Sequence, residues 1–166
     1  LETLDLLTEF GIQFTILSPH QARRARRIGV REWSDVSGGL IDPTAAYQIE
    51  LPSGRKISLF FYDGPVSRAV AFERLLVNGE DFANRLVGAF SAQREHSQLV
   101  HIATDGESYG HHTWLGDMGL AYALRLIESR QLARLTNYGE YLEKHPPQFE
   151  VEIFEDSSWS CPHGLE

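Results

Sequence analysis

The chain concentrates acid–base groups in one short segment, residues 103–112, which reads Ala-Thr-Asp-Gly-Glu-Ser-Tyr-Gly-His-His. The segment follows the apolar run 99–102 and precedes a helical pattern that begins near Trp114, so we predict that it joins the end of a strand to a helix. Catalytic groups in α/β folds collect at such strand ends. The carboxylates of Asp105 and Glu107 are therefore candidates for general acid–base catalysis.

The simplest structural role for these acids is to cap the following helix, but capping accounts for one acid and for neither of the adjacent histidines. If the segment is extended, the side chains of Asp105 and Glu107 project to the same side. His111 and His112 then diverge, so at most one of the two histidines faces the pocket of Asp105. We therefore favour a functional site over a solvated capping loop.

The bulk composition fits a single α/β domain spanning residues 1–166. Hydrophobic residues make up 42% of the 166 residues, enough for a core of ordinary size. The net charge of −8 argues against nucleic acid as a partner, and we interpret the basic run 23–27 as a solvated helix face or an anion contact rather than a DNA-binding patch. No stretch approaches the roughly 20 apolar residues of a membrane span. The single cysteine, Cys161, excludes an intrachain disulfide and favours a reducing, cytoplasmic location.

Hydrophobic periodicity and turn residues predict an alternation of helices and strands, which is typical of a parallel sheet. Helices are expected over residues 1–10, 21–28, 66–77, 80–93, 115–135 and 139–144, and strands over 12–17, 47–51, 56–62, 99–103 and 148–155. The strands 47–51 and 56–62 form a β-hairpin that interrupts the alternation, so we interpret the hairpin as an insertion. The first residues already have helical spacing, which suggests a piece cut from a longer protein.

Two further polar residues follow predicted strands. His20 follows the strand 12–17 and Asp63 follows the strand 56–62, so both are expected at the same rim as Asp105. Each also has a structural alternative: His20 caps a helix or bonds a backbone carbonyl, and Asp63 caps the helix that starts near Pro65. His101 alternates with apolar neighbours and is expected to be buried.

Several segments together resemble glycoside hydrolase family 57, in a bacterial branch of that family. They are Asp-Gly-Glu-Ser-Tyr-Gly at 105–110, Phe-Thr-Ile-Leu-Ser-Pro-His at 14–20, Phe-Phe-Tyr-Asp-Gly-Pro at 60–65 and Ser-Ser-Trp-Ser-Cys-Pro-His-Gly at 157–164. The family includes α-amylases, amylopullulanases, 4-α-glucanotransferases and glycogen branching enzymes. The resemblance implies a fold of class α/β, here a partial (β/α)7-type parallel barrel with the inserted hairpin.

The resemblance also implies a retaining glycosidase or transglycosylase that acts on α-glucans and needs no cofactor. Asp105 corresponds to the general acid/base, and Glu107 is expected to position Asp105 or a sugar hydroxyl. The nucleophilic glutamate is expected upstream of Leu1, so the fragment alone should be inactive. The remaining candidate sugar contacts are His20, Asp63, Tyr109, His111 and Trp114. A partial barrel exposes an edge strand, which predicts self-association or pairing with the missing barrel segment.

Two alternative functions remain open. A metal-dependent hydrolase such as a polysaccharide deacetylase would use Asp105, His111, His112 and His20 as ligands, although adjacent histidines on an extended segment diverge. Cys161 and His163 are too few for a zinc site, so we predict no metal. The other alternative is a non-catalytic carbohydrate-binding piece whose acids have lost their partner.

Overall fold

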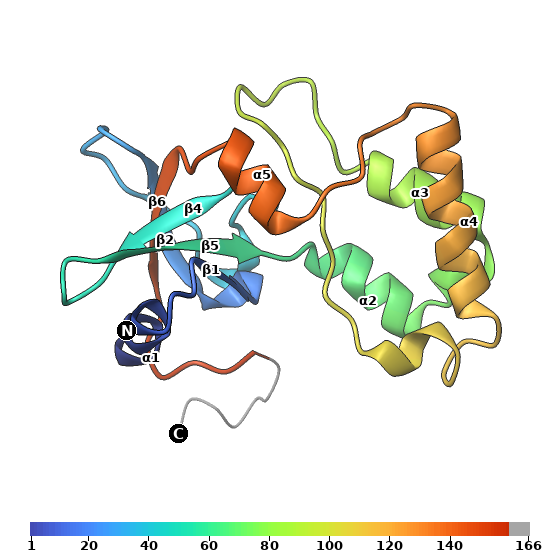
Figure 1. Cartoon of the computed structure of the whole chain (residues 1–166), viewed down its shortest axis with the longest axis horizontal. Coiled ribbons are helices and arrows are strands. Elements are labelled where there is room, and N and C mark those ends of the chain that lie inside the picture. The colour runs from blue at the N-terminus through green and yellow to red at the C-terminus, as the bar shows by residue number, and fades with distance from the viewer. Residues whose placement is uncertain (160–166) are drawn as a thin grey trace.

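The computed structural model describes residues 1–159, and the candidate metal ligands Cys161 and His163 lie outside the described residues. The chain folds into a sheet half and a helical half, with α5 on the sheet half (Figure 1). The sheet half contains α1 (Glu2–Glu9), β1 (Phe14–Leu17), β2 (Ala22–Arg27), β3 (Ser34–Asp35), β4 (Tyr47–Glu50), β5 (Lys56–Phe61), α5 (Tyr138–Lys144) and β6 (Phe149–Ile153). The helical half contains α2 (Gly64–Phe72), α3 (Gly79–Val87) and α4 (Gly116–Ser129). Short 3-10 turns η1 to η4 cover Pro19–Gln21, Ser37–Gly39, Leu75–Val77 and Gly106–Tyr109.

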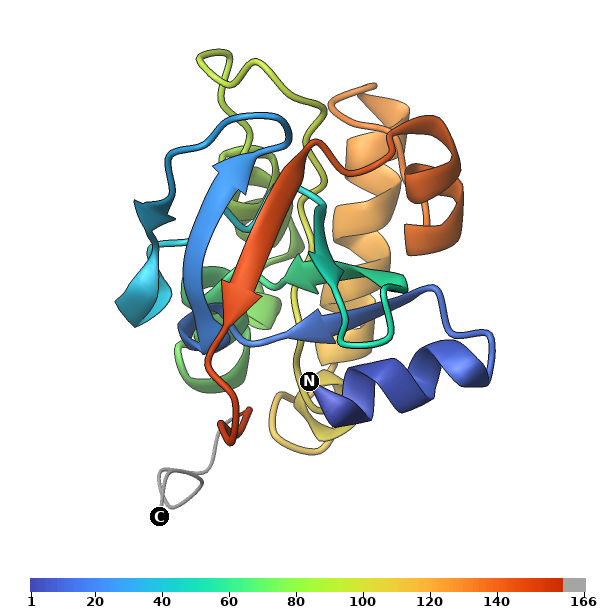
Figure 2. The ribbon, with the colours of Figure 1, turned by 90° about the vertical axis from the view of Figure 1, so that its left-hand side faces the viewer.

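Within residues 1–159, six strands form one mixed sheet in the order β1-β5-β4-β6-β2-β3 (Figure 2). β1 pairs with β5 in parallel, as expected for a βα-type core, and β4 pairs with β6 in parallel. The hairpin of β4 and β5 forms as predicted, with antiparallel pairing. The hairpin does not lie outside the sheet, as an added insertion would, because β5 is the parallel partner of β1 and β4 lies between β5 and β6. The hairpin therefore belongs to the main sheet.

The two faces of β5 pack against different neighbours, because successive side chains of a strand point to opposite faces. Ile57, Leu59 and Phe61 belong to one apolar cluster, which also contains Leu4 of α1. Phe60 belongs to the opposite cluster, with Tyr141 of α5. The strand is buried on both faces and ends at the candidate site.

The helical half has its own apolar core, formed by α2, α3 and α4. Its helices approach closely at a glycine. A Cβ atom added to Gly119 would lie 2.1 Å from the carbonyl oxygen of Leu76, which is shorter than any van der Waals contact. α4 therefore packs directly against the backbone of η3.

The predicted helix over residues 21–28 is wrong, because this basic segment is strand β2. Its antiparallel neighbour β6 supplies carboxylates that are distant in the sequence. Arg24 pairs with Glu152 and Arg26 with Glu150, at N···O distances of 2.7 and 2.6 Å. The ring of Trp33 lies 4.9 Å from one guanidinium and 4.3 Å from the other. The arginines are thus held on the surface of a sheet rather than on a helix.

The predicted strand 99–103 is also wrong, because this segment joins no sheet ladder among the described residues. It is held instead by single backbone bonds: Leu99 N donates to Thr44 O at 2.8 Å, and Asp63 N donates to His101 O at 3.0 Å. The segment crosses between the two halves of the molecule (Figure 1). It runs past the end of β5 and so brings the candidate site to that end.

Three predicted helices end earlier than expected, and two of them are followed, two residues on, by a non-glycine residue with positive φ. The helix expected over 66–77 ends at Phe72, and Arg74 follows with φ of 59°. The helix expected over 115–135 ends at Ser129, and Gln131 follows with φ of 53°. The third, expected over 80–93, ends at Val87. No helix in the described part of the chain is long and apolar enough to cross a membrane.

His101 is buried, as expected, and ties three segments together. Its Nε2 donates to Pro43 O at 3.1 Å, since a carbonyl can only accept, and its Nδ1 therefore accepts from the Tyr138 hydroxyl at 3.0 Å. Burial lowers the pKa of His101 to about 4, against a smaller opposing effect of the bond to Pro43. The neutral imidazole is the form that the fold requires.

We expect this histidine to make the fold acid-sensitive. An unfolded histidine has a pKa near 6.5, so the unfolded chain binds the extra proton first as the pH falls. Stability from His101 is complete above that value and is lost as the pH falls towards 4. The expected loss is about 2 to 3 kcal/mol between pH 7.5 and 4.5, measured by urea unfolding at each pH. A His101→Gln variant should be less stable at pH 7.5 but should lose less on acidification; an equal loss in both proteins would contradict this.

Candidate active site

The segment 105–112 is a turn rather than an extended strand end. Gly106–Tyr109 form the 3-10 turn η4, and the backbone amides of His111 and His112 both donate to Glu107 O, at 3.0 and 2.9 Å. The extended backbone on which the same-side projection of Asp105 and Glu107 depended is therefore not formed here. The two histidines do not diverge either, since their ring centroids lie 4.9 Å apart.

The carboxylates of Asp105 and Glu107 are both exposed, and no residue among 1–159 donates a hydrogen bond to them or forms an ion pair with them. Asp105 precedes η4 but its side chain caps nothing, and α4 begins after Leu115 without a side-chain cap. Helix capping therefore explains neither acid. Asp63 differs, because its Oδ1 accepts from Val66 N at 2.9 Å and caps α2, as its structural alternative predicted.

A buried serine links the end of β5 to the approach to the turn. Ser67 Oγ donates to Asp63 O at 2.6 Å and accepts from Ala103 N at 3.1 Å. Asp63 N in turn donates to His101 O. Ala103 lies two residues before Asp105, so the catalytic candidate is fixed to the rim formed by β5 and the first turn of α2.

The other side of the turn rests on α4. A Cβ atom added to Gly116 would lie 3.0 Å from Ser108 O and 3.2 Å from the Cα of Tyr109. The Tyr109 hydroxyl also bonds Thr104 Oγ1 at 2.8 Å, which closes the turn on itself. The turn is held from both sides while its carboxylates remain exposed.

A cleft of about 520 Å³ opens at the carboxyl ends of β1 and β5. It contains two of the predicted site residues, His20 and Asp63. Its other lining residues are Ser18, Pro19, Gly38, Gly39, Ile41, Pro43, Tyr62, Gly64 and Pro65. Asp105, Glu107, Tyr109, His111 and Trp114 do not line it. The structure therefore separates the predicted residues into a cleft group and a turn group.

His20 already has partners at both ring nitrogens. Its Nε2 donates to Ser158 O at 3.1 Å, so its Nδ1 accepts from Ser18 Oγ at 2.8 Å. The Tyr62 hydroxyl completes the chain, 3.1 Å from Ser18 Oγ. The carbonyl contact that the sequence left as an alternative for His20 is confirmed, and the ring fastens residues 157–159 to the cleft.

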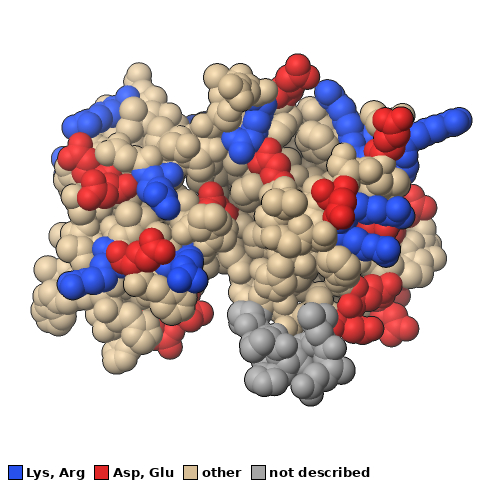
Figure 3. All heavy atoms as spheres, turned by 180° about the vertical axis from the view of Figure 1, so that it is seen from behind, with Lys and Arg blue, Asp and Glu red and all other residues tan. Residues whose placement is uncertain are grey.

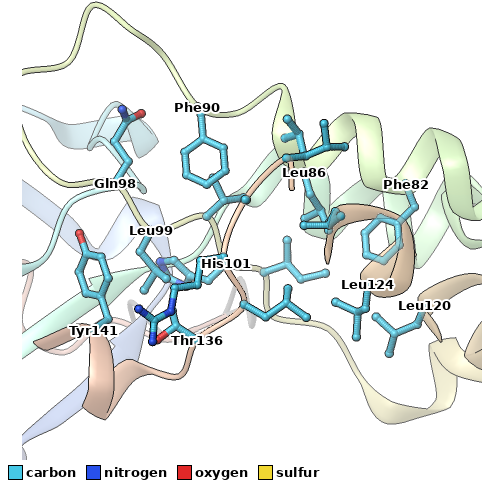
Figure 4. Close-up of a pocket in the computed structure, with 18 of the residues that line it drawn as sticks. Phe82, Leu86, Phe90, Gln98, Leu99, His101, Leu120, Leu124, Thr136 and Tyr141 are labelled. Atoms are coloured by element: carbon cyan, nitrogen blue, oxygen red, sulfur yellow. The ribbon is translucent and has the colours of Figure 1, made fainter. Parts of the chain in front are cut away.

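A second cavity, of about 560 Å³, separates the helical half from α5 and the segment 98–102 (Figure 4). Phe82, Leu86, Leu120 and Leu124 form its helical side, and Leu99, His101 and Tyr141 lie opposite. Tyr109 is the one predicted site residue in its lining. Trp114 is 84% exposed and lines neither this cavity nor the cleft.

Among residues 1–159, no group of three or more His, Cys, Asp or Glu side chains is arranged to hold an ion. His111 and His112 lie together but have no third partner within the described residues.

On the face seen in Figure 3, positive and negative side chains are interspersed rather than gathered by sign.

Sequence reasoning missed Ser67, Tyr62 and the Gly38-Gly39 wall of the cleft. A signal existed for Tyr62, which directly precedes Asp63 at the end of a strand. Ser67 stands in the first turn after Asp-Gly-Pro, but its bond to Ala103 crosses 36 residues and has no local signature.

The sequence profile of glycosyl hydrolase family 57 matches residues 2–153, almost the whole described chain. The chain belongs to glycosyl hydrolase family 57. This match confirms the family that the motif segments resemble, and the segment 157–164 lies beyond the matched residues. No curated protein sequence matches the chain.

The solved structures that share the fold of this family 57 chain include two enzymes. One is an exo-type maltose-forming amylase from Pyrococcus sp. ST04, with a TM-score of 0.62, 18% identity, and coverage of 92% of this chain and 26% of that chain. The other is a 4-α-glucanotransferase from Thermococcus litoralis, with a TM-score of 0.64, 22% identity, and coverage of 97% of this chain and 24% of that chain. The chain thus spans about a quarter of the length of each.

Proposed function

We propose that this family 57 chain is the acid/base-bearing part of a retaining glycosidase or transglycosylase that acts on α-glucans. The observation that carries the proposal is the combination of an exposed carboxylate and a held backbone at Asp105. Its carboxylate is exposed and has no structural partner among residues 1–159, yet its backbone is fixed on both sides. The substrate class is supported by the amylase and the glucanotransferase that share the fold.

In this mechanism Asp105 protonates the glycosidic oxygen and later accepts a proton from water or an acceptor hydroxyl. A retaining enzyme needs a second carboxyl, about 5–5.5 Å away, as the nucleophile. We assign the nucleophile to a segment outside residues 1–166. Glu107 positions Asp105 or a sugar hydroxyl from the same turn. Tyr109, His111 and Trp114 make further sugar contacts from the turn and the start of α4.

The same proposal treats residues 1–166 as one domain, a portion of a (β/α)7-type barrel in a cytoplasmic protein. β1 is an edge of the sheet, with β5 as its partner in the described chain. An unpaired edge invites another strand. We therefore expect this domain to pair with the missing barrel segment, or with a second copy when that segment is absent.

The test uses the protein extended upstream of Leu1, incubated with a panel of α-glucans and maltooligosaccharides. We expect shorter or transferred glucan chains, released first as the α-anomer when products are followed by NMR before mutarotation. First release of the β-anomer would overturn the retaining mechanism. Untouched glucans together with stoichiometric bound metal would favour a deacetylase, and untouched glucans without metal would favour a binding role.

The serine bridge makes a further prediction about this reaction. Ser67→Ala removes the bonds to Asp63 O and Ala103 N and should cost about 1 kcal/mol of stability. Because Asp105 is then less well fixed, kcat should fall about tenfold with little change in KM. Ser129→Ala, which removes a serine bond to Leu126 O at the end of α4, is the matched control. Equal kcat values in the two variants would contradict the positioning role.

A further inference from the structure

The cavity of about 560 Å³ between the helical half and α5 has mostly apolar walls (Figure 4). Large apolar side chains of α3, α4 and the segment 99–102 form most of its lining. Part of this lining reaches solvent, because the lining residues Phe90, Leu132 and Leu135 are 37%, 40% and 38% exposed. An occupant with a hydrocarbon part would remove this apolar surface from water, which is favourable in proportion to the area covered.

Three polar side chains in the cavity wall have their hydrogen-bonding groups bonded within the protein. Both ring nitrogens of His101 have partners, and the Tyr141 hydroxyl donates to Ser97 O at 2.6 Å. The amide of Gln98 donates to Ser91 O at 2.8 Å and accepts from Ser91 N at 2.9 Å. A ligand rich in hydroxyls would lose hydrogen bonds to water here with few replacements. The wall therefore favours hydrocarbon over carbohydrate.

The charges at the cavity are of one sign. None of the described residues that line it is an aspartate or a glutamate, although the whole chain has a net charge of −8. Arg134 and Lys144 line it on the α5 side, and both contact the same carboxylate oxygen, Glu140 Oε1. These three side chains together carry one excess positive charge. Because the side chains of Arg134 and Lys144 are 72% and 44% exposed, this charge lies where the cavity meets solvent.

We propose that the cavity binds the hydrocarbon chain of an anionic amphiphile, a medium-chain fatty acid, with its carboxylate beside Arg134 and Lys144. The apolar wall matches the hydrocarbon chain, and the excess positive charge matches the carboxylate. The volume, about 560 Å³, lies within the range of small-molecule sites. The inference does not rest on the proposed function, because neither Asp105 nor the cleft at the ends of β1 and β5 takes part. A bound chain would contact both halves of the molecule and should stabilise them together.

The test is isothermal titration calorimetry of the extended protein with dodecanoate below its micelle concentration. The extended protein is used so that segments outside residues 1–166 are present and can compete for the cavity. We expect saturable one-to-one binding. Decanoate should bind about 15-fold more weakly, or about fourfold for each methylene group removed. Dodecyltrimethylammonium, which has the same chain and the opposite charge, should bind at least about tenfold more weakly.

Two results of this titration would overturn the inference. Absence of saturable binding up to about 1 mM dodecanoate would show that the cavity is closed or filled by another segment of the protein. Equal affinity for the anionic and the cationic amphiphile would show that Arg134 and Lys144 do not select the head group.

Variants then test the position of the ligand. Arg134→Gln and Lys144→Gln should each weaken dodecanoate binding about fivefold. Arg130→Gln is the matched control, because Arg130 is an exposed arginine that pairs with Glu80 at 3.4 Å and does not line the cavity. If the three variants bind dodecanoate equally, the carboxylate does not lie beside Arg134 and Lys144, and the inference is wrong.

A cavity-filling variant tests the site of the hydrocarbon chain. Leu124→Trp places a larger side chain in the cavity wall and should abolish dodecanoate binding. Dodecanoate should raise the thermal unfolding midpoint of the wild type but not that of this variant. An unchanged affinity in Leu124→Trp would place the ligand elsewhere and overturn the inference. If this variant does not fold, the ligand series and the two variants of the cationic residues still decide the point.

Discussion

Asp105→Asn in the extended protein is expected to lower kcat on α-glucans at least about a hundredfold, while the thermal unfolding midpoint stays unchanged. The lower kcat and the unchanged unfolding midpoint have the same cause. The Asp105 carboxylate makes no hydrogen bond or ion pair within residues 1–159, so the amide costs the fold nothing there, but it cannot donate the proton that the leaving oxygen needs.

The role as general acid also predicts a dependence on the leaving group. An aryl α-glucoside with an acidic phenol needs little protonation, so Asp105→Asn should slow its cleavage less than it slows the cleavage of a glucan. The matched control is Asp117→Asn, an exposed acid in the first turn of α4. If the two variants have equal activity, Asp105 is not the acid/base.

Gly119→Ala is expected to destabilise the helical half by about 3 kcal/mol. Inside a helix this substitution normally raises stability, by up to about 1 kcal/mol, because alanine has the higher helix propensity. Here the added Cβ atom would lie 2.1 Å from Leu76 O, a backbone atom that cannot rotate away. Steric repulsion should therefore outweigh the gain in helix propensity, so that the substitution lowers stability instead of raising it.

The control for this prediction is Gly139→Ala in α5, where the nearest atom to the new Cβ would be Asn137 Oδ1 at 3.4 Å. This variant should be neutral or slightly more stable than the wild type. Urea unfolding of both variants measures the difference directly. A Gly119→Ala protein as stable as the Gly139→Ala protein would show that α4 and η3 can separate without cost.

Local patterns predicted the elements whose signals are local. The hairpin of β4 and β5, the helix α5 and the cap by Asp63 all depend on residues within a few positions of one another. The run of arginines in β2 was wrongly predicted to be a helix, because its stabilising partners, Glu150 and Glu152, lie more than 120 residues away in the sequence. A basic segment with two alanines carries no period strong enough to replace that information.

The sequence singled out the candidate residues of the segment 103–112 but did not predict their geometry. The segment 103–112 was singled out by its composition, and its two carboxylates are exposed and have no bonding partner among residues 1–159. The conformation of η4 and the contact between His111 and His112 depend on packing against Gly116 and on backbone bonds to Glu107, which no spacing rule encodes. The separation of the cleft from the turn arises in the same way, because residues 99–103 pair with no strand.

The place of β6 in the sheet sets an order of assembly for the chain. β6 is synthesised after every other strand of the described sheet, yet it lies between β4 and β2. Until Ile153 has left the ribosome, β2 and β3 have no bonded connection to the remaining strands of the described sheet. During that interval, Arg24 and Arg26 of β2 lack their ion-pair partners Glu152 and Glu150. Contacts of such long sequence separation form slowly, so the synthesis of β6, rather than local folding of the early segments, should determine when the described sheet closes.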